Sequence, residues 1–133
     1  MRDDIELAHG AVSRTIIAAY FHVYNNVDVG LSEAVYHRAM LIALAMRGLE
    51  TRSEVLFDVV FESTVVGSYR ADIVVERKFL VELKSVEKLV KVHEAQVYNY
   101  LRISKLPVAL LMNFGDMPSF RRLVLPRRAS PNR

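Results

Sequence analysis

The middle of the chain holds three short runs of β-branched and aromatic residues, and segments with helical spacing lie on both sides of them. The runs cover Val55 to Phe61, Tyr69 to Val75 and Phe79 to Leu83. Gly67-Ser68 separates the first two runs, and Glu76-Arg77-Lys78 separates the second and third at hairpin length. We therefore predict a three-stranded antiparallel meander at the centre of the fold.

Helical periodicity flanks this predicted meander. Apolar residues recur on one face from about Ile5 to Tyr24, which predicts a first helix. A second helix is expected from Ser32, or slightly earlier, to about Arg47, with Gly48 as its left-handed C-terminal cap. A third is expected from about Val90 to Ser104, ending before Pro107, because proline and the residue before it disfavour helix.

Two more strands complete the predicted fold. Val108 to Met112 is a continuous apolar run typical of a strand buried on both faces, and Arg121 to Leu125 predicts a short edge strand ended by Pro126. The resulting order, ααβββαβ(β), predicts an α+β protein with a mixed sheet of four to five strands flanked by helices. The length of 133 residues suits one domain, expected at 1–126, followed by a basic flexible tail at 127–133.

Composition excludes several classes of protein. Hydrophobic residues make up 52% and charged residues 25%, which excludes a disordered chain. The absence of cysteine excludes disulfide scaffolds, thiolate zinc sites and cysteine nucleophiles, and it favours a reducing, cytoplasmic compartment. Because the N-terminus is acidic and no apolar run approaches the roughly 18 residues of a membrane span, we expect neither a signal peptide nor a membrane partner.

The positive charge is concentrated at the C-terminus. The formal net charge is +3, yet the last thirteen residues hold five arginines and no acid, so the first 120 residues carry −2. Such a tail is compatible with an anchor for a polyanion and equally with an ordinary solvated terminus. A uniformly cationic nucleic-acid binder is not indicated.

The residues best suited to chemistry lie on the second and third predicted strands. Glu82 and Lys84 are two apart in a strand and therefore project to one face. If the hairpin turns near Arg77-Lys78, Asp72 lies opposite Glu82, and two carboxylates meet one ammonium. An ordinary cross-strand ion pair is the alternative. The apolar neighbours on both strands favour a functional site, because buried charges need a partner or a cation.

Three sequence blocks resemble those of the PD-(D/E)XK nuclease superfamily, and of its GxxExxY branch in particular. Asp72 followed by Glu82-x-Lys84 resembles the nuclease motif, with Ala71 where the superfamily has proline. Gly-Leu-Ser-Glu-Ala-Val-Tyr at 30–36 carries the GxxExxY pattern through Gly30, Glu33 and Tyr36. His-Glu-Ala-Gln at 93–96, followed by Tyr100, resembles the Q-x-x-x-Y motif of RecB-like nucleases. The resemblance extends over about residues 23–114.

The resemblance implies a restriction-endonuclease-like core, an α/β/α sandwich, and a Mg²⁺-dependent nuclease acting on nucleic acid, in the first place DNA. It implies that Mg²⁺, which Mn²⁺ would replace, is held by Asp72, Glu82, the Leu83 carbonyl and Glu33. Lys84 would orient or activate the attacking water, and Gln96 and Tyr100 would position Lys84 or the phosphate. The basic residues expected to contact nucleic acid are Arg121, Arg122, Arg127 and Arg128.

Structural alternatives stand beside these roles. Glu33 suits the first turn of a helix as an acid favoured by the helix dipole, and His37, four residues later, suits a surface contact with it. Tyr36 and Tyr100 are equally compatible with core aromatics. The alternative function is a non-catalytic nucleic-acid-binding or assembly module that retains the nuclease fold. The oligomeric state stays open between a monomer and a homodimer formed through the first helices.

Overall fold

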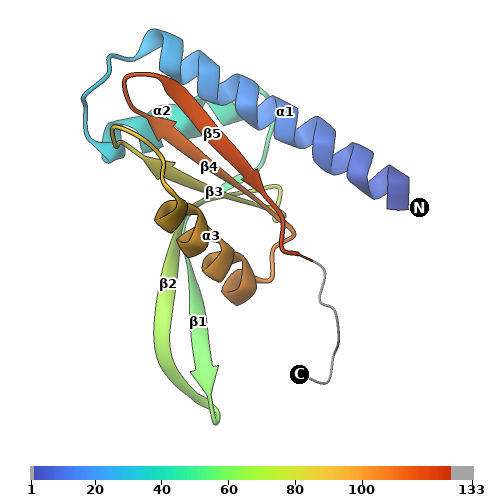
Figure 1. Cartoon of the computed structure of the whole chain (residues 1–133). Coiled ribbons are helices and arrows are strands. Elements are labelled where there is room, and N and C mark those ends of the chain that lie inside the picture. The colour runs from blue at the N-terminus through green and yellow to red at the C-terminus, as the bar shows by residue number, and fades with distance from the viewer. Residues whose placement is uncertain (1, 127–133) are drawn as a thin grey trace.

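A five-stranded mixed sheet lies between two layers of helices (Figure 1). The computed structural model describes residues 2–126. Its strands stand in the order β1-β2-β3-β4-β5, and all neighbours are antiparallel except β3 and β4, which are parallel and joined through α3. The elements are α1 (Arg2–Asn26), α2 (Glu33–Met46), β1 (Thr51–Phe61), β2 (Thr64–Val75), β3 (Phe79–Lys84), α3 (Lys91–Ser104), β4 (Val108–Phe114) and β5 (Pro118–Leu123).

Each face of the sheet has its own hydrophobic core. Side chains that alternate along the strands pack against α1 and α2 on one face and against α3 on the other. Val81 and Leu83 belong to the first core, and Leu80 belongs to the second. β4 is buried along its whole length, as its apolar run predicts. The predicted α+β class, the α/β/α layering and the restriction-endonuclease-like core are therefore confirmed.

The helix ends are close to those predicted from the sequence. α2 ends at Met46, and Gly48 adopts a left-handed φ of 75° while its N–H donates to the Ala45 carbonyl. Gly48 thus provides the predicted C-terminal cap, since a residue without Cβ enters this region at little cost. α3 ends at Ser104 as expected, with Lys105 in the left-handed region. No helix among residues 2–126 is both long and apolar enough to cross a membrane.

The predicted break between the first two strands is wrong. Gly67 and Ser68 lie inside β2, where they pair with Val59 and Asp58, and the chain turns instead at Glu62-Ser63. Both turn residues adopt left-handed φ angles, 50° and 61°, so two non-glycine residues make the turn that glycine was expected to mark. As a result β1 and β2 form a long hairpin that extends beyond the rest of the sheet (Figure 1).

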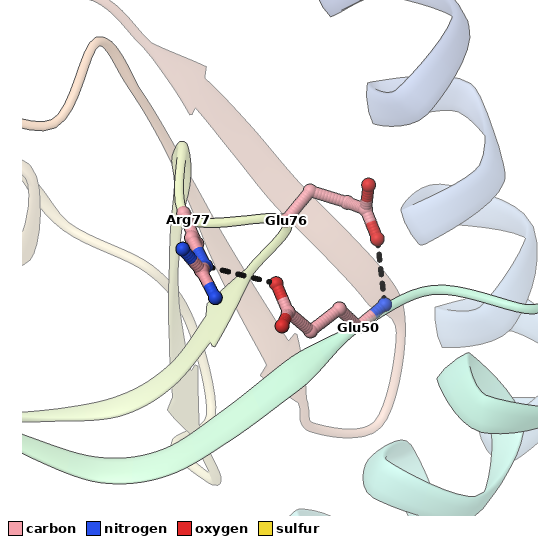
Figure 2. A network of polar contacts seen from close by, with 3 residues as sticks. All are labelled: Glu50, Glu76 and Arg77. Carbon is pink, nitrogen blue, oxygen red and sulfur yellow. Dashed lines mark hydrogen bonds and ion pairs between the residues drawn. The ribbon is translucent and has the colours of Figure 1, made fainter.

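The β2–β3 turn is fixed by polar contacts with Glu50, the residue just before β1, as Figure 2 shows. Glu76 and Arg77 take φ angles of 53° and 59°, and the Lys78 N–H donates to the Val75 carbonyl, as in a type I′ turn. Oε2 of Glu76 accepts from the Glu50 N–H at 2.6 Å, and Nε of Arg77 lies 3.3 Å from Oε1 of Glu50. The turn sets the register of the two strands that carry the candidate carboxylates.

The last strand differs from its predicted position. β5 begins at Pro118 and ends at Leu123, a few residues earlier than the expected Arg121 to Leu125. Proline is tolerated there because it is the first residue of an edge strand. The predicted end at Pro126 is therefore also wrong, and the predicted tail at 127–133 lies outside the described residues.

Candidate active site

Asp72 and Glu82 lie together where β2 separates from β3. The β2–β3 ladder pairs Ile73 with Val81, and the next pair in the same register is Asp72 with Glu82, as the sequence predicts. The Asp72 N–H donates to Oε2 of Glu82 at 3.0 Å. The Leu83 N–H donates to Oδ2 of Asp72 at 2.8 Å. At this point, carboxylate oxygens take the place of backbone carbonyls as the acceptors between the strands.

An irregularity on the other side of β2 accompanies this separation. The β1–β2 ladder pairs Ser53 with Ile73 and Val55 with Ala71, so the pair between them, Glu54 and Asp72, is skipped. Glu54 adopts a left-handed φ of 55°. Ala71 and Ile73 are two apart in β2 and would face the same side of a regular strand, yet Ile73 belongs to the first hydrophobic core and Ala71 to the second. The alternation of side chains between the two faces of the sheet therefore shifts by one residue at Asp72.

Tyr69 completes the surroundings of Glu82. Glu82 is only 7% exposed, and Oε2 accepts a hydrogen bond from the Tyr69 hydroxyl at 2.5 Å. The Tyr69 ring stacks on Tyr100 of α3, with a centroid separation of 3.4 Å and an interplanar angle of 13°. The sequence prediction omitted Tyr69. Its only signal is its position three residues before Asp72, at the start of the buried part of β2.

Burial weakens the acidity of both carboxyl groups. Burial and the neighbouring Asp72 raise the pKa of Glu82 to about 7. Burial also raises the pKa of Asp72, although the Leu83 N–H, His37 and Lys84 oppose the rise. The Tyr69 pKa is raised as well, by burial and by Glu82, so its hydroxyl stays protonated and acts as the donor. The pair therefore resists full ionisation unless a further positive charge joins it.

The carboxylates suit a hard divalent cation. In the described part of the chain, Oε1 of Glu82 and Oδ1 of Asp72 accept no hydrogen bond. Neither is a buried unpaired atom, so both reach solvent. Such oxygens, together with the Leu83 carbonyl, are ligands that Mg²⁺ prefers. No group of three or more His, Cys, Asp or Glu side chains gathers at metal-binding distance within these residues, so the cation ligands brought together at this point are the two carboxylates and the Leu83 carbonyl.

Lys84 lies near Asp72 and Glu82 and pairs with the neighbouring strand β4. It is close enough to lower the pKa of both Asp72 and Glu82, and it pairs in the parallel ladder with Asn113. The Asn113 side chain is fully buried, accepts from the Val86 N–H and donates to the Val86 carbonyl, each at 2.9 Å. Asn113 thus fixes the chain just after Lys84, and the sequence prediction omitted it, since a single asparagine in an apolar strand carries no motif.

The tyrosine of the GxxExxY pattern is a core residue. Tyr36 is 1% exposed and stacks on Phe114 with ring centroids 4.4 Å apart and almost parallel. Its hydroxyl donates to the Asp28 carbonyl at 2.6 Å and accepts from the Leu31 N–H at 3.1 Å. The structural alternative weighed for Tyr36 is therefore supported: it holds the loop before α2 against the core. Gly30, in that loop, has a φ of 83° that favours glycine.

The other residues of the sequence motifs make no hydrogen bond to Asp72 or Glu82 in the described structure. Glu33 is exposed in the first turn of α2, and Gln96 is exposed on α3. Nε2 of His37 lies 2.7 Å from Ser53 Oγ, a contact with β1 in place of the expected one with Glu33. Nδ1 of His93 accepts from the Val90 N–H at 3.0 Å, which places His93 at the N-terminus of α3 as a capping residue.

Two of the four arginines expected to bind nucleic acid contact other side chains of the same chain. Nε of Arg121 lies 3.3 Å from Oε2 of Glu94, and Nε of Arg122 lies 3.3 Å from Ser13 Oγ. Both residues are on the exposed edge strand β5. The other two, Arg127 and Arg128, lie outside the described residues.

The fold and the paired carboxylates define a restriction-endonuclease-like protein, and the comparison with protein families agrees. Residues 10–123 match the family described as the PD-(D/E)XK nuclease superfamily. The chain belongs to this superfamily. None of the curated proteins is similar enough to this chain to count as a relative.

A solved structure has the same fold. The crystal structure of SSO0001 matches with a TM-score of 0.58 and 16% sequence identity, over 71% of this chain and 50% of that one. This chain therefore spans half the length of that protein, and at such low identity the likeness concerns the fold alone.

Proposed function

We propose that this protein is a Mg²⁺-dependent nuclease that hydrolyses phosphodiester bonds in nucleic acid, with DNA as its substrate. The observation that carries the proposal is a pair of hydrogen bonds, from the Asp72 N–H to Glu82 and from the Leu83 N–H to Asp72, which holds two carboxylates together beside Lys84. Each carboxylate keeps one oxygen that accepts no hydrogen bond and is not fully buried in the described structure, and this oxygen is the one proposed to meet a cation. Membership of the nuclease superfamily supports the same chemistry.

The residues of the candidate site have different parts in the proposed reaction. Asp72 and Glu82, with the Leu83 carbonyl, would hold the cation, and Mn²⁺ would substitute for Mg²⁺. The bound cation would lower the pKa of a water and neutralise charge on the attacked phosphate. Lys84 would orient the attacking water and offset the negative charge that develops on the phosphate oxygens. Asn113 would keep Lys84 in place through the Val86 backbone.

Residues on the helices would assist this centre. We assign the chain to the GxxExxY branch, with Glu33 as an additional carboxylate near the cation and Gln96 near the phosphate. Both side chains are exposed, as groups that meet a bound substrate must be. The arginines of β5 and of residues 127–128 would add attraction for the phosphate backbone, because the first 120 residues are net acidic.

A cleavage assay tests the proposal. Single- and double-stranded DNA and RNA are incubated with the protein in Mg²⁺, Mn²⁺ or EDTA. We expect cleavage of DNA with either metal, none in EDTA, and a loss of at least a hundredfold for Asp72→Ala and Lys84→Ala. Lys78→Ala, in the exposed β2–β3 turn, is the matched control and should cleave normally. Cleavage that persists in Lys84→Ala would overturn the proposed site.

A non-catalytic nucleic-acid-binding or assembly module is the second candidate. The observation that favours it is the exposed position of Arg121 and Arg122 on the edge strand β5. Salt-dependent binding of DNA that needs no divalent cation, without cleavage in Mg²⁺ or Mn²⁺, would support this module instead of the nuclease.

A further inference from the structure

Three aromatic rings from three elements lie side by side next to Glu82. Phe57 of β1 and Tyr69 of β2 are cross-strand partners, with ring centroids 6.3 Å apart and an interplanar angle of 18°. Tyr100 of α3 stacks on Tyr69 at 3.4 Å and 13°. The three rings are therefore nearly parallel, and only Tyr69 has a hydrogen bond to a carboxylate of the candidate site.

We propose that Tyr69 is a positioning residue for Glu82, and that Tyr100 acts through the Tyr69 ring and not by contact of its own hydroxyl with the substrate. The inference rests on the proposed metal site. It adds a residue that no motif includes, and it gives the tyrosine of the Q-x-x-x-Y motif a specific physical role.

The hydrogen bonds of Glu82 explain how Tyr69 acts. Oε2 accepts from both the Tyr69 hydroxyl and the Asp72 N–H, at 2.5 and 3.0 Å. With one oxygen held by two donors, the carboxylate has a single orientation, and Oε1 is the oxygen left to face a cation. Without the hydroxyl, the one donor to Oε2 that remains among the described residues is the Asp72 N–H, and the carboxylate can rotate.

The stack explains the contribution of Tyr100. Tyr69 is 8% exposed, and its ring lies against Phe57 of β1 and against Tyr100 of α3. The Tyr100 ring covers one side of it from α3. Such a contact depends on the aromatic ring and not on the hydroxyl of Tyr100, whereas the contact between Tyr69 and Glu82 depends on the hydroxyl.

Mn²⁺ binding, measured by calorimetric titration of the full chain, tests this difference. We expect Tyr69→Phe to weaken Mn²⁺ binding about tenfold, within the range typical of residues that orient a metal ligand. Tyr100→Leu should weaken it several-fold, and Tyr100→Phe should restore it to within about twofold of the unaltered protein. Tyr98→Phe, on the same helix and without a hydrogen bond in the described structure, is the matched control.

The double variant decides whether Tyr100 acts through Tyr69. If it does, Tyr69→Phe with Tyr100→Leu binds Mn²⁺ no more weakly than Tyr69→Phe alone, and cleavage kinetics show a lower kcat with an unchanged KM for DNA. Additive losses of Mn²⁺ affinity in the double variant would overturn the inference, and so would a raised KM for DNA in Tyr100→Phe. Unaltered Mn²⁺ affinity in Tyr69→Phe, or no Mn²⁺ binding by the unaltered protein, would also overturn it. Mn²⁺ binding with these effects but without cleavage would leave the inference standing and overturn the nuclease proposal alone.

Discussion

Asp72 donates its backbone N–H to Oε2 of Glu82, so the residue that carries one carboxylate also holds the other. The Leu83 N–H in turn holds Oδ2 of Asp72. This arrangement keeps two mutually repelling groups close together, and it is possible because the β2–β3 ladder stops at the pair of Ile73 and Val81, just before Asp72 in β2 and just before Glu82 in β3.

Removal of the Lys84 charge should separate metal binding from catalysis. The Lys84 ammonium lowers the pKa of both carboxyl groups, and a cation in the same place would be repelled by it. We expect Lys84→Met to bind Mn²⁺ as tightly as the unaltered protein or a few-fold more tightly, and to lose cleavage at least a hundredfold. Calorimetry and a cleavage assay measure the two effects. Asp72→Asn is the counterpart, and it should lose both.

The metal-free protein should become less stable as the pH rises. Folding raises the Glu82 pKa from 4.5 to about 7, so the folded state binds more protons than the unfolded state between these values. The free energy of unfolding therefore falls across this interval, by a loss on the order of 3 kcal/mol. Asp72 changes in the same direction. Urea unfolding in EDTA at pH 5 and pH 8 measures the difference.

Glu82→Gln serves as the control for this pH dependence. Glutamine has the size of glutamic acid and does not ionise, so its stability should vary less between pH 5 and pH 8. Saturating Mn²⁺ should also restore stability to the unaltered protein at pH 8, because a ligand that binds only the folded state stabilises it. Equal pH dependence in Glu82→Gln would show that another group is responsible.

Tyr36→Phe should affect stability and leave the metal site unchanged. The hydroxyl donates to the Asp28 carbonyl and accepts from the Leu31 N–H in the loop before α2. Loss of both hydrogen bonds from a buried position should lower the free energy of unfolding by about 1–2 kcal/mol, as measured by urea unfolding. Mn²⁺ affinity should stay within twofold. A tenfold loss of affinity with normal stability would instead assign Tyr36 to the active site.

Gly115→Ala should be strongly destabilising. A Cβ at this position would lie 2.3 Å from the Val86 carbonyl oxygen and 2.9 Å from Nδ2 of Asn113, so the segment after Lys84 would have to move. We expect a loss of about 1–3 kcal/mol, together with weaker cleavage. Gly67→Ala is the matched control, because nothing lies within 4 Å of its Cβ, and its stability should be equal or slightly higher. Thermal unfolding compares the two variants.

Periodicity and turn chemistry predicted most of the elements. The order of helices and strands, the cap at Gly48 and the proximity of Asp72 and Glu82 are confirmed by the structure. The errors fall on the hairpin turn and on β5. Residues 62–63 carry no glycine, yet both adopt left-handed φ, and pairing along the whole of β1 and β2 outweighs the local preference of Gly67 for a turn.

The sequence alone determined which residues can carry chemistry, because a strand period of two and a short turn bring two carboxylates and a lysine to one place. Only the tertiary structure decided how the pair is held. Tyr69 reaches Glu82 because β2 shifts its alternation at Asp72, and Tyr100 supports it from a helix about thirty residues away. Such contacts arise between elements that are distant along the chain, and no local pattern records them.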